Sequence, residues 1–156
     1  MDHKDLCVIA AKYLKTKGIV SFHRCNYVVC ELERQGESPD AFGFSSGTTQ
    51  LIEVKVSRSD FLSDKNKYWR KRPEYGIGAY RSYLCPIDVI KKSDLPIGWG
   101  LLYIDENNKI IEVMPPIKQQ SNNSEEFRLM LSLFRREGIK PQIFSYKQYK
   151  STLATV

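Results

Sequence analysis

The spacing of apolar residues in the first third of the chain predicts one helix followed by three strands. In residues 4–17 apolar positions recur at helical intervals up to a Lys-Thr-Lys-Gly stop. Residues 26–32, NYVVCEL, are β-branched and aromatic and predict a strand. Residues 40–45 and 49–56 flank the turn residues Ser-Gly-Thr, which is typical of the two arms of a hairpin.

The remainder predicts a second helix, then strands, then a last helix. "SRSDFLSDKNKYW" is expected to be a helix with Ser57 as its N-cap and Asp60 at the capping-box position, ended by Pro73. The later elements are a strand at 80–85, a short helical connection at 86–96, a hairpin with arms at 99–105 and 109–114, and a helix within about 124–138. The order α-β-β-β-α-β, followed by a β-hairpin and a C-terminal helix, predicts an α/β fold with a central mixed sheet flanked by helices.

The last helix carries a clear apolar pattern. Its expected packing face consists of Phe127, Met130, Leu131 and Phe134, and Gly138 is expected to end it. Trp99 is interpreted as a core residue. The tail after Pro141 is predicted to be loose.

Length and composition favour one globular domain. With 156 residues, 42% hydrophobic and 27% charged, the chain is expected to form a single domain over 1–156, with its core at about 4–116. No apolar run approaches the roughly 20 residues that span a bilayer, so no membrane partner is expected. The N-terminus does not resemble a signal peptide, and the four cysteines are expected to be reduced. A cytoplasmic, intracellular protein is predicted.

The charge balance favours a polyanionic partner. The formal net charge is +6 and the pI is near 9.1. Residues 64–81 are rich in Lys and Arg with interleaved aromatic residues, which suits nucleic acid. A solvated helix face and loop explains the same segment equally well.

Two charged residues interrupt the apolar strand at 49–56. Alternation along a strand places Glu53 and Lys55 on one face, with Leu51 beside them, and leaves Ile52, Val54 and Val56 for the other face. A slipped register would bury both charges in the apolar layer, so the register is strongly specified. A salt-bridged strand facing solvent is the alternative interpretation.

The predicted hairpin brings a second acid to Glu53. With a two-residue Ser46-Gly47 turn, Asp40 falls directly across from Glu53, with the Cβ atoms about 5 Å apart. Opposed carboxylates destabilise a sheet unless a cation lies between them. Oxygen ligands favour Mg²⁺, with Mn²⁺ as a substitute, held by Asp40, Glu53 and the backbone carbonyl of Val54. On the same face, Lys55 would hold or deprotonate an attacking water, or offset phosphate charge.

A second candidate metal site, for zinc, consists of one histidine and two cysteines. His23, Cys25 and Cys30 are near one another in sequence, but they lack paired C-x-x-C spacing. Cysteines packed as small apolar groups explain them better.

These residues carry a resemblance to a known superfamily. "PDAFGF" with "LIEVKVSRSDF" resembles the PD-(D/E)xK nucleases, as Pro39-Asp40 and Glu53-x-Lys55. "EVKVSRSDFLSDKNKYW", "YRSYLCP" and "LPIGWGLLYIDENNKIIEVMPP" are similar to the MmcB-like branch of DNA-repair nucleases, which includes phage and mobile-element versions. The likeness runs from about Glu31 to Pro116 and implies a restriction-endonuclease-like αβββαβ core.

The resemblance implies roles for individual residues. Asp40 and Glu53 would be metal ligands, Lys55 the water-positioning residue and Glu31 an additional acid, with Glu33 as the substitute candidate. A strand-edge acid facing water is the alternative for Glu31. Whether the first helix brings Asp2 or Asp5 into range stays open.

Further residues are candidates for nucleic-acid contact. Arg58 at a helix N-terminus suits a phosphate, whereas Ser57 and Asp60 are interpreted as caps. Tyr68 and Trp69 suit base stacking, with core packing the better interpretation for one of them. The expected backbone contacts are Lys65, Lys67, Arg70, Lys71 and Arg72.

The sequence therefore predicts a Mg²⁺-dependent DNA nuclease, an endonuclease, in repair, recombination or mobile-element metabolism. A homodimer is expected if both strands of a duplex are cut. The alternatives are a non-cleaving nucleic-acid-binding accessory protein with the same fold and an RNA-processing nuclease.

Overall fold

Six strands form one mixed sheet whose spatial order follows the sequence, β1-β2-β3-β4-β5-β6. The computed structural model describes residues 1–20, 23–31 and 36–140. The pairs β1–β2, β2–β3 and β5–β6 are antiparallel, whereas β3–β4 and β4–β5 are parallel. The strands are Tyr27–Cys30, Ala41–Ser45, Thr48–Val54, Tyr80–Pro86, Gly100–Ile104 and Ile110–Met114. The predicted α/β class, with a mixed sheet flanked by helices, is confirmed.

The β2–β3 hairpin has the predicted register. Ser45 pairs with Thr48 around a two-residue turn, and the ladder continues to the pair Ala41 and Ile52. Gly47 has a φ of 79°, a conformation that glycine adopts without the steric cost of a Cβ atom. Because Asp40 directly precedes Ala41, and Glu53 directly follows Ile52, the register brings these two residues to neighbouring positions.

The connection from β3 to β4 contains two short helices instead of the single helix predicted. Helix α2 spans Arg58–Asp64, helix α3 spans Tyr68–Lys71, and a 3-10 helix follows at Pro73–Tyr75. In a continuous helix Asp64 and Arg70, six residues apart, would point in different directions. The break between α2 and α3 lets Arg70 Nε lie 2.7 Å from Asp64 Oδ2. The chain thus forms this ion pair where a continuous helix would have formed further backbone hydrogen bonds. The connection at 86–96 contains only the 3-10 helix Lys92–Asp94.

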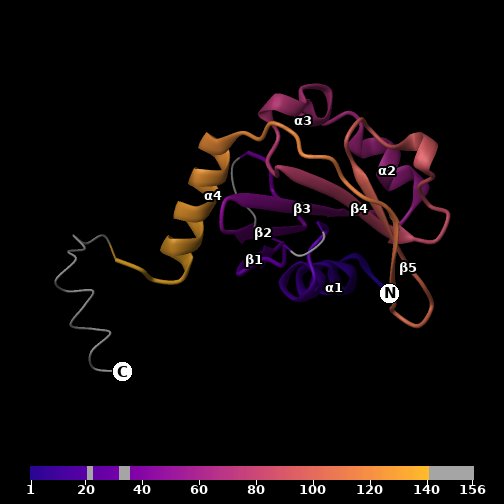
Figure 1. Ribbon diagram of the computed structural model, residues 1–156, viewed down its shortest axis with the longest axis horizontal. Coiled ribbons are helices and arrows are strands. Elements are labelled where there is room, and N and C mark those ends of the chain that lie inside the picture. Colours follow the sequence, from indigo (N-terminus) through magenta and orange to yellow (C-terminus); the bar gives the residue numbers. More distant parts are fainter. Residues whose placement is uncertain (21–22, 32–35, 141–156) are drawn as a thin grey trace.

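Helices cover both faces of the sheet, and each face has its own apolar layer. Helix α1, His3–Thr16, lies on one face, and α2 and α3 lie on the other (Figure 1). Period-two alternation divides the strand residues between the layers. The α1 layer includes Leu6, Cys7, Ala10, Leu14, Ala41, Ile52, Val54, Leu84, Leu102 and Ile104. The opposite layer includes Phe42, Leu51, Phe61, Ile77, Tyr83, Cys85, Ile90, Trp99, Leu101 and Leu129.

This alternation confirms that Ile52 and Val54 pack under a helix while Leu51 lies on the other face. Val56, which was predicted to pack with Ile52 and Val54, lies beyond the end of β3 and is exposed. Trp99 is buried as predicted, stacked on Tyr83 with ring centroids 4.4 Å apart.

Helix α4, Asn123–Arg136, packs with a different face from the one predicted. It lies beside the β2–β3 hairpin (Figure 1) and buries Leu129 in the layer opposite α1. Glu126 anchors it, accepting hydrogen bonds from the Gly78 amide and the Thr49 hydroxyl, both at 2.8 Å. Phe127, at 61% exposure, and Phe134 lie outside the packed face, because the buried hydrogen bonds of Glu126 fix the rotation of the helix.

The predicted loose tail after Pro141 lies outside the described residues. Among the residues that are described, none of the helices combines the length and apolar character needed to cross a membrane.

Candidate functional site

Asp40 lies where three elements meet: the start of α1, the end of β1 and the end of β3. Its Oδ2 accepts a hydrogen bond of 2.8 Å from the Val54 amide, and its Oδ1 lies 3.4 Å from His3 Nε2. Its backbone carbonyl accepts a 3.0 Å hydrogen bond from the Glu31 amide. The hydrogen bond from Glu31 therefore holds the backbone of Asp40, and contacts from α1 and β3 hold its carboxylate.

Burial raises the pKa of the Asp40 carboxyl group to about 6, and the negative charge of Glu53 adds to this effect. The positive charge of Lys55, the Val54 amide and His3 oppose the rise but do not cancel it. A like charge raises a carboxyl pKa only when it is close. The charge of Glu53 thus acts on Asp40, although the two carboxylates have different partners: Asp40 Oδ1 faces His3 of α1, and Glu53 faces Lys55 and Arg70.

Glu53 and Lys55 point to the same face, and both side chains are sealed from solvent. They are 1% and 5% exposed, and Lys55 Nζ lies 3.3 Å from Glu53 Oε2. Burial disfavours the charge on Lys55, but the carboxylates of Glu53 and Asp64 outweigh burial and raise the pKa of its ammonium group. Lys55 therefore stays protonated at neutral pH. The alternative interpretation, a salt-bridged strand facing solvent, predicted the Lys55–Glu53 ion pair correctly. Its prediction that these side chains face solvent is wrong.

Glu53 and Lys55 belong to a larger buried set of charges, here called the ionic cluster: Glu37, Glu53, Lys55, Asp64, Lys67 and Arg70. Arg70 is its centre, with nitrogens 2.7 Å from Asp64 Oδ2 and 2.9 Å from Glu37 Oε1. Lys67 Nζ lies 2.8 Å from Asp64 Oδ1 and 3.5 Å from Glu53 Oε2. The other members of the cluster cover Glu53 on the face of the sheet that carries α2 and α3.

The position of Arg70 corrects one sequence prediction. It was expected on the surface as a phosphate contact, but its side chain is only 3% exposed. Its guanidinium lies over the Trp99 ring, 4.6 Å from the centroid, and pairs with buried acids. The break between α2 and α3 turns it inward, which a continuous helix would not have done.

One oxygen of the acid pair is left without a hydrogen bond. Among the described residues, Glu53 Oε1 is buried and accepts none, although Arg70 Nη2 lies 3.4 Å away. Buried polar atoms in this condition are uncommon and call for an explanation. Here the Arg70 guanidinium supplies the explanation, because it neutralises the Glu53 charge from ion-pair distance. The Val54 backbone reaches Asp40 through its amide.

Glu31 is exposed and lies at the end of β1, next to Asp40. It has a φ of 49°, rare for a residue with a side chain, and its amide is held by Asp40. Its substitute candidate, Glu33, lies outside the described residues. Asp2 and Asp5 form a capping box at the start of α1, with the Asp5 amide donating to Asp2 Oδ1 at 2.9 Å. That contact gives both acids a structural role.

The residues that follow β3 divide into caps and surface groups. Ser57 caps α2 by accepting a 3.2 Å hydrogen bond from the Asp60 amide, as predicted. Asp60 closes the turn from the other side, but it accepts from the Val56 amide at 3.1 Å. Arg58 is committed to an ion pair with Asp94, with Nη2 2.8 Å from Oδ1.

The other predicted nucleic-acid contacts lie on the outside of α2 and α3. Lys65, Lys71 and Arg72 are exposed, and Lys67 is 39% exposed. Tyr68 is also exposed and packs on Tyr75 with centroids 5.5 Å apart, whereas the Trp69 ring nitrogen is buried. Of the two adjacent aromatics, Tyr68 is therefore the one available for stacking.

His23, Cys25 and Cys30, all among the described residues, do not gather at metal-ligand distance. Cys25 is buried in the α1 layer, directly against Gly43, where a Cβ atom would lie 2.3 Å from its sulfur. Within the described residues, the side chains that do gather at metal-ligand distance are His3, Cys7 and Glu31.

Sequence reasoning missed four residues of this region: His3, Cys7, Glu37 and Asp64. His3 and Cys7 are four residues apart on a helix, a spacing that places them on one side and was available as a signal. Glu37 and Asp64 occur in polar segments, where an acid normally faces solvent, so no local pattern marks them as buried.

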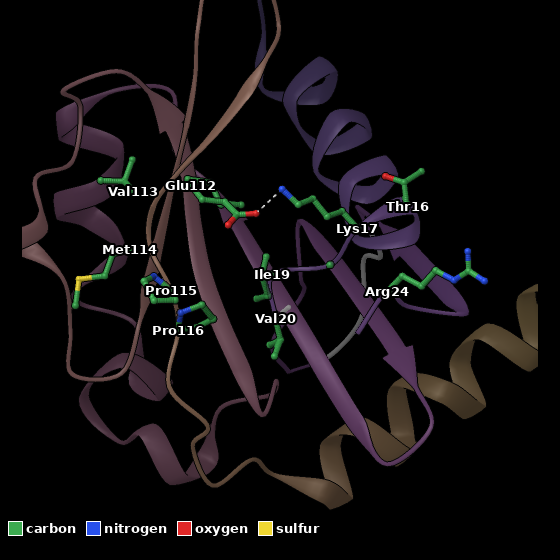
Figure 2. A pocket seen from close by; sticks show the side chains of 12 residues that line it. Thr16, Lys17, Ile19, Val20, Arg24, Glu112, Val113, Met114, Pro115 and Pro116 are labelled. Atoms are coloured by element: carbon green, nitrogen blue, oxygen red, sulfur yellow. Dashed lines mark ion pairs between the residues drawn. The ribbon is translucent and has the colours of Figure 1, made fainter. Parts of the chain in front are cut away.

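A cavity of about 930 Å³ lies at the far end of α1, between Lys17, Arg24 and strand β6. The Lys17–Glu112 ion pair, 2.8 Å long, crosses its rim (Figure 2). Because α1 has 14 residues, and a helix rises 1.5 Å per residue, this end is about 20 Å from His3. The cavity is separate from the acid pair.

Comparison with known proteins adds little to this geometry. No family model and no curated protein matches the chain. A solved structure described as the SPO1766 protein of unknown function from Silicibacter pomeroyi is similar to it, with 24% sequence identity and a TM-score of 0.47. The similarity covers 76% of this chain and 84% of that chain.

Proposed function

We propose that this protein is a Mg²⁺-dependent DNA nuclease that hydrolyses phosphodiester bonds. The observation that carries the proposal is that Asp40 and Glu53 directly adjoin the pair Ala41 and Ile52 at the end of the β2–β3 ladder, with Lys55 Nζ 3.3 Å from Glu53 Oε2. The raised pKa of Asp40 fits an acid whose charge is incompletely compensated and that a bound cation would stabilise.

Asp40, Glu53 and the Val54 carbonyl would hold the ion, which supplies phosphate polarisation and a more acidic bound water. The raised pKa of Lys55 favours two of its three expected roles, holding a water and offsetting phosphate charge, over proton abstraction. Glu31, which the resemblance implies as the additional acid, is left out of the proposed nuclease site because its carboxylate gathers with His3 and Cys7. The order α1-β1-β2-β3-α2-α3-β4 supports a restriction-endonuclease-like core of the MmcB-like type.

The ionic cluster sets a condition on metal binding. Glu53 Oε2 now faces the ammonium groups of Lys55 and Lys67, at 3.3 and 3.5 Å. A divalent ion at Glu53 would repel both ammonium groups. The Lys67 side chain is 39% exposed, so it can swing away from Glu53 into solvent. Its new partner would be the phosphate backbone of DNA, which matches the exposed Lys65, Lys71 and Arg72 nearby.

The test is a cleavage panel with Mg²⁺ or Mn²⁺ over duplex, nicked, branched and single-stranded DNA and single-stranded RNA. We expect cutting of DNA that stops with EDTA and falls at least 100-fold in Asp40→Asn and Lys55→Met. Asp64→Asn is the matched control. It removes another acid that pairs with Lys55, Lys67 and Arg70, but Asp64 is not a proposed metal ligand, so cutting should persist. Full activity in both site variants would refute the proposal. Cutting of both strands would further imply a homodimer.

The second candidate is an accessory protein that binds nucleic acid without cutting it. It is favoured by the near-complete burial of Glu53 and Lys55 within the ionic cluster, which suits a structural network. DNA binding that is independent of metal, with no cleavage of any substrate in the panel, would establish this candidate instead. Cleavage restricted to RNA would assign an RNA-processing nuclease.

A further inference from the structure

We propose that His3, Cys7 and Glu31 form a binding site for one zinc-class divalent ion, distinct from the Asp40–Glu53 pair and independent of nuclease activity. Among the described residues, one ligand atom from each of the three lies within 4.8 Å of the others. The site would join the first turn of α1 to the end of β1.

The distance between the two α1 ligands matches a tetrahedral zinc site. Cys7 Sγ lies 3.5 Å from His3 Nδ1. Bond lengths of about 2.3 Å to sulfur and about 2.05 Å to nitrogen, at the tetrahedral angle, place the two donor atoms about 3.5–3.6 Å apart. Cys7 Sγ also lies 4.0 Å from His3 Nε2, so the sulfur lies beside the ring between its two nitrogens. Rotation of the imidazole would direct a nitrogen lone pair to an ion between the two side chains, with no movement of the helix backbone.

Asp40 orients the histidine for this role. Cys7 Sγ lies nearer to His3 Nδ1, at 3.5 Å, than to His3 Nε2, at 4.0 Å, and Nε2 lies 3.4 Å from Asp40 Oδ1. Metal-binding histidines commonly direct their second ring nitrogen to a carboxylate, which fixes the ring and makes the ligand nitrogen more basic. The Val54 amide holds Asp40 in place through its other oxygen, at 2.8 Å.

Glu31 supplies the third ligand from a different element. Its backbone is fixed by the hydrogen bond to the Asp40 carbonyl, while its side chain is exposed and able to close onto the ion. The positive φ of 49° turns the chain at the end of β1, next to the N-terminal turn of α1. The three ligands leave a fourth coordination position for water.

The donor set selects the kind of metal. Thiolate and imidazole favour Zn²⁺, and Co²⁺ as its spectroscopic substitute, over Mg²⁺, which prefers oxygen ligands. The hard-cation pair at Asp40 and Glu53 and the softer site at His3, Cys7 and Glu31 therefore differ in the metal they prefer. Asp40 contributes to the zinc site only through His3.

The experiment uses the full chain, carrying no histidine tag, stripped of metal and titrated with Zn²⁺ and with Co²⁺. We expect one Zn²⁺ per chain and a near-ultraviolet thiolate-to-Co²⁺ absorption band. Cys7→Ser should abolish the band, and His3→Gln and Glu31→Gln should weaken Zn²⁺ binding at least tenfold. Asp40→Asn, acting through the histidine, should weaken it by roughly 10–100-fold.

Matched controls keep the assignment falsifiable. His23→Gln changes the other histidine and Cys30→Ser a neighbouring half-buried thiol, and both should leave Zn²⁺ affinity and the band unchanged. Loss of the band in Cys30→Ser, or equal Zn²⁺ affinity in His3→Gln and the wild type, would overturn the proposal. If Cys7→Ser fails to fold, His3→Gln and Glu31→Gln, which change partly or fully exposed side chains, decide the outcome. None of these measurements depends on DNA cleavage.

Discussion

Among single residues, burial and neighbouring charges together set the pKa values of Asp40 and Lys55. Asp40 is a partly buried acid whose hydrogen bond from Val54 does not offset the loss of solvation and the charge of Glu53. Lys55 shows the reverse balance, since the acids around it outweigh the same loss. Each ionic state is therefore held by specific neighbours, and changing one neighbour alters the others.

The raised pKa of Asp40 predicts how stability depends on pH in metal-free protein. The pKa is about 6 in the folded state against 3.8 for an unperturbed aspartate, so the folded state binds more protons between these values. Stability contributed by this group is present below about pH 4 and is lost as pH rises through 6. The loss is at most about 3 kcal/mol.

Asp40→Asn removes this titration and keeps an oxygen for the Val54 amide. We expect the variant to gain stability relative to wild type between pH 4 and 6, by about 1–3 kcal/mol. Urea unfolding at several pH values, in EDTA, measures this difference. Parallel pH profiles for the two proteins would contradict the assigned pKa.

Removing Lys55 takes away one of the three cations that Glu53 and Asp64 share and leaves Lys67 and Arg70. We expect Lys55→Met to cost about 3 kcal/mol in the free energy of unfolding, because two buried carboxylates lose part of their compensating charge. The double variant Glu53→Gln/Lys55→Met should lose less than the sum of the two single variants. Strict additivity in this double-mutant cycle would show that the two side chains do not interact.

At the scale of elements, helix ends and helix rotation decide which side chains reach the interior. The α2 helix begins at a serine cap and stops after seven residues, which lets α3 start in a new direction. Helix α4 is rotated so that an acid and a leucine face the sheet while aromatic residues face outward. Both features depend on hydrogen bonds and ion pairs formed with distant segments.

The rotation of α4 is tested by two substitutions on the same helix. Leu129→Ala should cost about 2–5 kcal/mol, because Leu129 is fully buried in the layer opposite α1. Phe127→Ala should change stability by no more than about 0.5 kcal/mol, because the phenyl ring is 61% exposed. Thermal unfolding of both variants measures the contrast, and a larger loss for Phe127→Ala would support the face predicted from the sequence.

The cap of α2 makes a separate prediction. Ser57→Ala removes the acceptor of the Asp60 amide and should cost about 1 kcal/mol. Ser63→Ala is the matched control, since that hydroxyl only bonds the Ser59 carbonyl on the exposed side of the same helix. Equal denaturant midpoints for Ser57→Ala and the wild type would rule out a stabilising cap.

At the scale of the whole molecule, a net charge of +6 is combined with an acid pair at the meeting point of three elements. The sheet carries the acids, and the α2–α3 connection carries exposed cations on the same face as Glu53 and Lys55. A polyanion bound to those cations would lie over the ionic cluster. Binding to DNA should therefore depend strongly on salt.

The joint variant Lys65→Ala/Lys71→Ala/Arg72→Ala should weaken DNA binding across all sequences. If each side chain neutralises one phosphate, the slope of log affinity against log salt falls in magnitude by about 3. Fluorescence anisotropy over a salt series measures the slope.

The charge-matched control is Lys12→Ala/Lys15→Ala/Lys109→Ala. Lys12 and Lys15 lie on exposed positions of α1, on the other face of the sheet, and Lys109 is exposed in the turn between β5 and β6. An equal change in slope for both triple variants would mean that net charge alone, and no particular surface, governs binding.

The order of the strands, the hairpin register and the face shared by Glu53 and Lys55 could all be predicted from short stretches of sequence. They follow from local periodicity and from a two-residue turn, whose effects extend over only a few residues. The inward turn of Arg70, the burial of Asp64 and Glu37, and the approach of His3 and Cys7 to Glu31 could not, because they arise when the chain packs. Those outcomes depend on charges meeting across segments distant in sequence, and desolvation there is set by packing that no local pattern encodes.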